Sequence, residues 1–274
     1  MNPMIRKELR QRMRERRSWV LPSLYLLALG ATVVLAYYLS TSGTPFAGDI
    51  RQGAEVGITV FLTVAFAQLT LLLLMAPVFS AGSLTIEKEQ RTMAMLLTSL
   101  LSSSEIWVGK FVSAILFLVL LLVSSLPVLG LAFSLGGIGP EELARATVMT
   151  LLVLASMCAM GLYFSSVFKR SVHSTAVSYA AVIALCGVTF IVYVLLQSHW
   201  EAKIALMNQS LPHPMPRYYM TPLYLNPYYA LMSSLIREQQ KFPDWLICGL
   251  VFLALGVGSA LLAFRNIRQR GEMG

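Results

Sequence analysis

The chain has 274 residues, of which 57% are hydrophobic and 12% are charged, and its mean hydropathy is +0.69. A soluble domain carries about 25% charged residues, so this composition excludes an ordinary water-soluble globular protein. The formal net charge of +8 could suit nucleic-acid binding. The basic residues, however, gather beside apolar segments, which is typical of membrane proteins and predicts no nucleic-acid partner.

Residues 1–17 precede the first apolar segment and are rich in basic side chains. Apolar residues recur every four positions among them, a pattern that favours a helix lying in the membrane interface. Such a helix would anchor the chain to anionic lipid, and it could also contact a cytoplasmic partner. The residues assigned to this interfacial amphipathic helix are Ile5, Arg6, Lys7, Leu9 and Met13.

Six long apolar segments follow. A helix needs about 20 residues to cross a hydrocarbon core of about 30 Å, and its backbone groups must be bonded within the segment. The predicted fold class is therefore an all-α membrane protein with six transmembrane helices, in a single transmembrane domain over residues 1–274. The first segment is too long for a signal-peptide core of about 7–15 residues and is expected to be retained. The segments are Ser18–Leu39, Val56–Ile86, Phe111–Gly137, Thr147–Phe168, Val172–Leu196 and Trp245–Phe264.

The distribution of basic residues predicts the orientation. If the N-terminus is cytoplasmic, 15 of the 21 Lys and Arg lie in cytoplasmic pieces. The positive-inside rule then places both termini in the cytoplasm. Residues 197–244 become an extracytoplasmic loop, in which prolines and tyrosines predict short helices and turns near the lipid headgroups.

Several kinds of chemistry are missing from the sequence. The six apolar segments contain no Asp, Glu, Lys or Arg, which disfavours coupling to an ion gradient. No phosphate-binding loop of the Walker type occurs, and no His or Cys pair has metal-ligand spacing. A membrane enzyme is disfavoured because no catalytic pair at one membrane depth emerges. Gln68, in the second segment, could line a pathway or simply bond across helices.

Between the second and third segments lies an insert, residues 87–110, with charged ends and an amphipathic middle. Its apolar residues recur at three- and four-residue spacing, which predicts a short helix on the cytoplasmic surface. Ser102, Ser103 and Ser104 followed by Glu105 predict the start of a new helix. The insert could rest on lipid, or it could dock a partner.

The insert resembles the cytoplasmic element of type-2 ABC exporter permeases: an acidic-basic-acidic start, a Thr, a double Leu, a Ser-rich turn and a closing Gly-Lys. The opening of the chain, Asn2-Pro3 and then Arg6–Leu9, also resembles that family, as does Asn226–Leu231 before the last segment. Two positions depart from the family pattern, because Arg91 replaces a common Gly and Leu100 a common Pro. Both changes favour a more continuous helix.

The resemblance implies a permease subunit of an ATP-driven exporter in a bacterial inner membrane. A separate ATP-binding-cassette subunit would bind ATP and Mg²⁺, this chain would bind no cofactor or metal, and a second permease protomer would complete the pathway as a homodimer or heterodimer. The alternative is a non-transporting scaffold that recruits a cytoplasmic enzyme. The implied coupling residues are Glu87, Lys88, Glu89, Arg91, Thr92, Leu96, Leu97, Ser103, Glu105, Gly109 and Lys110; the implied external gate is Asn226, Pro227, Tyr228 and Tyr229.

Overall fold

A computed structural model describes residues 17–42, 50–90, 103–134, 138–206, 216–235 and 243–272. The described residues are almost entirely helical and contain no strand. Within these ranges, six helical spans are long and apolar enough to cross a membrane, which confirms the predicted number. The predicted interfacial helix and most of the amphipathic part of the insert lie outside the described residues.

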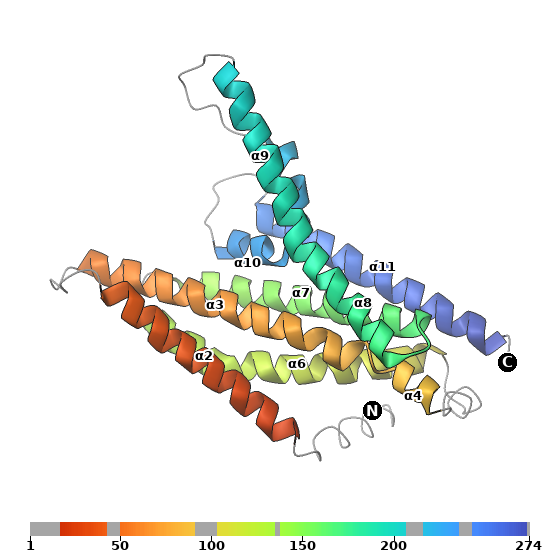
Figure 1. Cartoon of the computed structure of the whole chain (residues 1–274). Coiled ribbons are helices and arrows are strands. Elements are labelled where there is room, and N and C mark those ends of the chain that lie inside the picture. The colour runs from red at the N-terminus through yellow and green to blue at the C-terminus, as the bar shows by residue number, and fades with distance from the viewer. Residues whose placement is uncertain are drawn as a thin grey trace.

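Four of the spans are single helices, namely α2, α6, α7 and α11. Figure 1 shows how the spans are arranged. The second span, α3 with the following α4, ends beside the start of α6. The fifth consists of α8, a π-helical segment η1 and α9 in continuous sequence. The 3-10 helix η2 and the short helix α10 precede the last span. The bounds are α2 Arg17–Thr41, α3 Ile50–Ser80, α4 Thr85–Glu89, α6 Ser103–Ser134, α7 Pro140–Val167, α8 Ser171–Ile183, η1 Ala184–Val188, α9 Thr189–Leu206, η2 Arg217–Leu225, α10 Pro227–Leu235 and α11 Asp244–Glu272.

Helix α7 occupies the centre of the bundle, where it packs against α3, α6, α8, α10 and α11. Over its most apolar 18 residues, 56% are buried, the largest share of any span. Its buried residues include many small ones, such as Ser156, Ala159 and Gly161. Small side chains allow neighbouring helices to approach closely, which is how membrane helices associate without a hydrophobic driving force between them.

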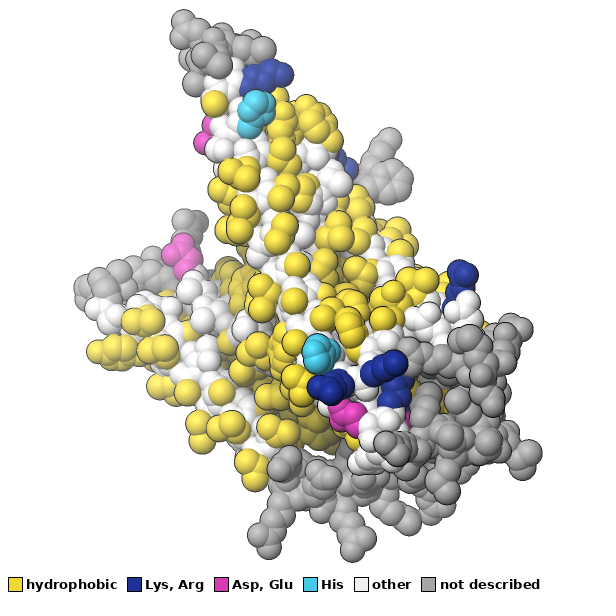
Figure 2. Space-filling model, turned by 45° about the vertical axis from the view of Figure 1, so that its right-hand side comes forward, with side chains coloured by type: hydrophobic (Ala, Val, Ile, Leu, Met, Phe, Trp, Pro, Cys, Tyr) yellow, Lys and Arg dark blue, Asp and Glu magenta, His cyan; other side chains and the backbone are white. Residues whose placement is uncertain are grey.

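The fifth span diverges from the bundle (Figure 1). Helix α8 packs against α7 and α3, whereas α9 packs against η2. Only 6% of the most apolar stretch of Ser171–Ile204 is buried within the protomer. Figure 2 shows apolar side chains along the projecting helix and charged side chains near its tip and near its opposite end. This distribution fits a helix that contacts lipid or another protein over most of its length.

The helices extend beyond the predicted apolar segments. Helix α6 begins at Ser103, as the serine run predicted, and therefore includes Glu105 and Lys110 in its first turns. Helix α9 continues to Leu206, although a loop was predicted from Gln197. The sequence argument placed helix ends where apolar residues stop, but polar residues outside the hydrocarbon core continue a helix at little cost.

Gly161 of α7 lies directly against the end of α3. A Cβ atom added there would lie 2.0 Å from Ser80 Oγ and 2.9 Å from Ser80 Cβ. Gly161→Ala is therefore expected to destabilise the protein by about 1–3 kcal/mol, the usual cost of overpacking. The measurement is the thermal unfolding of each variant in detergent micelles. Gly249→Ala is the control, because its Cβ would lie 3.7 Å from the nearest atom, Leu152 Cδ1; equal losses from both variants would contradict the prediction.

Candidate functional site

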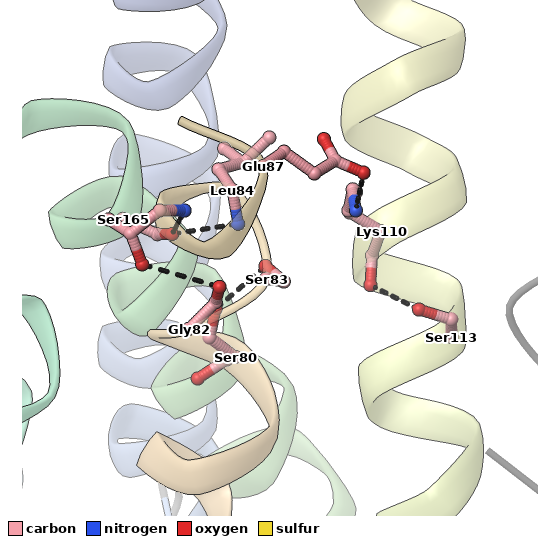
Figure 3. Close-up of polar contacts among 9 residues, drawn as sticks. Ser80, Gly82, Ser83, Leu84, Glu87, Lys110, Ser113 and Ser165 are labelled. Atoms are coloured by element: carbon pink, nitrogen blue, oxygen red, sulfur yellow. Dashed lines mark hydrogen bonds and ion pairs between the residues drawn. The ribbon is translucent and has the colours of Figure 1, made fainter. Parts of the chain in front are cut away.

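The second span is interrupted between α3 and α4. Pro77 lies in the last turn of α3, where its ring removes a backbone donor and weakens the helix. Helix α3 ends at Ser80, a turn follows, and α4 starts at Thr85. The backbone N–H groups of Leu84 and Thr85 donate to Ser165 Oγ of α7, over 3.0 and 3.1 Å (Figure 3). A side chain of α7 thus binds the first amides of α4, which have no partner within their own helix.

Glu87 joins α4 to α6 (Figure 3). Lys110 Nζ donates to Glu87 Oε1 over 2.5 Å. The side chains are 4% exposed for Lys110 and 18% exposed for Glu87. A charge buried to this degree is costly unless it is paired, so the two residues stabilise the contact between their helices as a unit.

Lys88 joins α4 to the end of α7. Its ammonium donates to three backbone carbonyls, of Ser165 at 2.5 Å, Ser166 at 2.9 Å and Phe168 at 2.9 Å. The last carbonyls of a helix have no intrahelical donor and carry the negative end of the helix dipole. A lysine has three donors, and here all three are directed to this helix end.

Glu89 joins α4 to the start of α8. The backbone N–H of Ser171 donates to Glu89 Oε1 over 2.7 Å, and the Ser171 hydroxyl donates to the same carboxylate over 3.0 Å. Helix α8 begins at Ser171, and its preceding residue, Arg170, provides no side-chain cap. The carboxylate therefore caps α8 and lies at the positive end of its dipole.

Three consecutive charged residues of α4 therefore contact three different helices. We refer to Glu87, Lys88 and Glu89, together with Lys110, Ser165, Ser166, Phe168 and Ser171, as the α4 junction. The sequence predicted that the charged residues belong to the insert, but not that they bind other helices of the same chain. Of their partners, Lys110 was among the implied coupling residues, whereas the serines at the ends of α7 and α8 carry only a weak sequence signal.

The remaining predicted coupling residues divide into two groups. Ser103, Glu105 and Gly109 lie in the first turns of α6, on the same helix as Lys110. Arg91, Thr92, Leu96 and Leu97 lie outside the described residues, as do Ile5, Arg6, Lys7, Leu9 and Met13. The roles given to these residues remain predictions.

The predicted external gate forms a second polar centre, at the start of α10. The Asn226 side-chain oxygen accepts from the backbone N–H of Tyr228 at 2.9 Å and caps this helix. Its amide nitrogen donates to the carbonyl of Cys186 at 2.9 Å and to Thr189 Oγ1 at 3.0 Å, in the fifth span. Pro227 starts the helix, a position where its missing N–H is harmless.

The two tyrosines after Pro227 bind two further spans. Tyr228 shares a hydrogen bond of 2.9 Å with Thr70 of α3, close to the middle of that apolar segment. Tyr229 donates to Asp244 of α11 over 2.9 Å. Burial and the neighbouring Asp244 carboxylate raise the pKa of Tyr229, so its hydroxyl stays a donor. Tyr224 also donates to Asp244, at 3.3 Å.

Gln68 is 3% exposed, on the same helix as Thr70, and lies among the core residues of α3. A pathway role for it stays a prediction. In the part of the chain that the structure describes, no group of three His, Cys, Asp or Glu residues is placed to hold a metal ion. The three cysteines, Cys158, Cys186 and Cys248, are thiols that are not joined in disulfides.

The family model of the ABC-2 family transporter proteins matches residues 3–266 of the chain. The chain belongs to this family. The match covers nearly all of the sequence and agrees with the six spans of the structure. A comparison with curated proteins gives no match. This ABC-2 protein is accordingly a multi-pass membrane permease of an ABC transporter, the kind of subunit that associates with an ATP-binding-cassette subunit.

Proposed function

We propose that this permease carries substrate out of a bacterial cytoplasm across the inner membrane, by alternating access that a separate ATPase drives. The observation that carries the proposal is the α4 junction. The ATPase would dock on residues 91–102, which follow α4 directly in sequence. A displacement there acts on α6 through Glu87, on α7 through Lys88 and on α8 through Glu89.

The distribution of basic residues supports a cytoplasmic position for the junction. Lys88, Lys110, Lys169 and Arg170 lie at this end of the bundle, together with the basic C-terminal turns of α11. The positive-inside rule then places both termini and the docking segment on the ATPase side. Helix α10 is bonded to Asp244 at the other end of α11, which supports an external position for the proposed gate.

A second protomer completes the proposed transporter. The small residues of α11 already pack within the protomer, since a Cβ at Gly256 would lie 3.3 Å from Ser156 Cα of α7. The small residues of α8, Ala176 and Ala180, are exposed instead. Stripes of small residues allow close helix contacts, which favours the fifth span as the side that meets the other permease subunit.

Co-purification tests the docking assignment. The double substitution Leu96→Asp and Leu97→Asp is expected to abolish co-purification with an ATP-binding-cassette subunit that binds the native permease. The apolar face predicted for residues 91–101 would otherwise enter a groove on the ATPase, as amphipathic helices do in general. Thr221→Asp, an exposed residue of η2, is the control and should leave binding intact.

Two outcomes would contradict the proposal. Full co-purification of the Leu96/Leu97 variant would remove residues 91–102 as the docking segment. If the native permease bound the ATPase in liposomes but did not change its rate of ATP hydrolysis, the alternative of a non-transporting scaffold would be favoured.

A further inference from the structure

The fifth span contains a π-helical segment, Ala184–Val188, between α8 and α9. Such segments are rare and often occur at functional positions. They insert an extra residue into a helical turn, which can redirect the helix. In Figure 1, α8 and α9 follow each other in one oblique line, with α8 against the bundle and α9 projecting beyond it. A π-helical segment leaves backbone carbonyls without their regular helical donors. Inside a membrane, these carbonyls need other hydrogen-bond donors.

Asn226 provides this compensation from another element. Its amide donates to the carbonyl of Cys186, inside the π segment, and to the hydroxyl of Thr189, the first residue of α9. The Thr189 hydroxyl in turn donates to the carbonyl of Leu185. Two carbonyls of the π segment are therefore bound by a network that begins at Asn226, which is itself only 3% exposed.

All four hydrogen-bonding positions of the Asn226 amide group are used. Two donors bind the fifth span, and the oxygen accepts from the backbone N–H groups of Tyr228 and Tyr229 at 2.9 and 3.4 Å. An N-cap needs only the oxygen. Serine or aspartate would cap α10 equally well, so capping alone does not explain an asparagine whose nitrogen is directed into the π segment.

We infer that Asn226 is a positioning residue that holds residues 184–188 in the π form and thereby sets the direction in which α9 leaves the bundle. Without its donors, Cys186 and its neighbours satisfy their carbonyls by regular α-helical bonds. The register then changes by about one residue, which rotates α9 by about 100° relative to α8. Because α10 is also bonded to Thr70 of α3 and Asp244 of α11, a movement of α10 changes the direction of α9.

Distance measurement by electron paramagnetic resonance tests this inference. Spin labels at Ser198 of α9 and Thr59 of α3, both exposed, are placed in the full-length permease with Cys186 replaced by Ser, in nanodiscs, and diluted with unlabelled permease. Asn226→Ser keeps the cap but removes both donors. It is expected to shift the distance by roughly 5–8 Å, because a 100° rotation moves a side chain about 5 Å from the helix axis by that amount.

Thr189→Val provides an independent variant, because it removes the hydroxyl that accepts from Asn226 while keeping the shape of the side chain. It is expected to shift the distance in the same direction, and the double variant should shift it no further than Asn226→Ser alone. If Asn226→Ser and Thr189→Val both keep the native distance while Asn226→Ala only lowers thermal stability, Asn226 is a helix cap and the inference is wrong. The experiment needs neither ATPase nor substrate, so its result is separate from that of the proposed function.

Discussion

Lys110→Met is expected to lower the free energy of unfolding by about 3–5 kcal/mol, the range for removing one partner of a buried ion pair. The Lys110 side chain is 4% exposed, and its ammonium lies 2.5 Å from the Glu87 carboxylate. Methionine keeps the length and the apolar stem, so packing changes little. The carboxylate of Glu87, 18% exposed, loses the cation that neutralises it. Equilibrium unfolding in mixed micelles, followed by circular dichroism, measures the loss.

The matching substitution on α4 separates the charge effect from packing. Glu87→Gln alone should also destabilise, because the buried Lys110 ammonium then loses the carboxylate that lies 2.5 Å away. The double variant should lose less than the sum of the two single variants, since neither charge is left behind. Glu141→Gln is the control. Glu141 is 70% exposed in its pair with Arg145, so that change should stay within about 1 kcal/mol. The prediction would be contradicted if Lys110→Met lowered the free energy of unfolding by no more than Glu141→Gln does.

The membrane architecture follows from the sequence because lipid imposes one strong rule. Every backbone group in the hydrocarbon core must bond within its segment, so length and apolarity are sufficient to identify a spanning helix. The same rule does not determine whether a spanning helix keeps one direction along its whole length. Val172–Leu196 reads as one uniform helix, and the π segment at Ala184–Val188 is not visible in it. Its cause lies 40 residues away, in the side chain of Asn226.

The site was predictable as a location but not as a set of contacts. Resemblance singled out Glu87, Lys88 and Glu89 as part of a coupling element. The structure assigns each of them a partner on a different helix. Pairings of this kind depend on how helix ends meet in three dimensions, and no local pattern around Ser165 or Ser171 specifies them. The physical cause of such pairings is nevertheless general. The N–H groups at the start of a helix attract negative charge, and the carbonyls at its end attract positive charge.

The two polar centres have a common design. At one end of the bundle, α4 is bonded to α6, α7 and α8; at the other, α10 and its cap are bonded to α3, the fifth span and α11. Each short helix therefore connects three spans through polar bonds, which fix the positions of these spans relative to one another. The fifth span takes part in both centres, through Ser171 at its start and Cys186 and Thr189 near its middle. It is therefore one of the elements, with α3 and α7, through which a displacement at α4 can reach α10.

Lys88→Met is expected to leave binding of the ATPase intact but to remove the effect of the permease on ATP hydrolysis. The ammonium of Lys88 is bonded to three carbonyls at the end of α7, and α7 is the central helix of the bundle. Without these bonds, α4 keeps its contact with the Ser165 hydroxyl at its start, but its later residues can move while the end of α7 stays in place. The free energy of unfolding should fall by about 1.5–3 kcal/mol, as for hydrogen bonds to charged groups. Hydrolysis is measured in liposomes that contain the permease and its ATPase.

Two further variants make the result specific to this geometry. Lys88→Arg should not restore coupling, because a planar guanidinium cannot direct its donors to three converging carbonyls as an ammonium can. Lys169→Met is the matched control, since Lys169 is an exposed lysine at the same end of the bundle, and it should behave like the native protein. If Lys88→Met lost stability but kept full coupling, Lys88 would be only a cap for α7, and movement would have to pass from α4 through Glu87 or Glu89 instead.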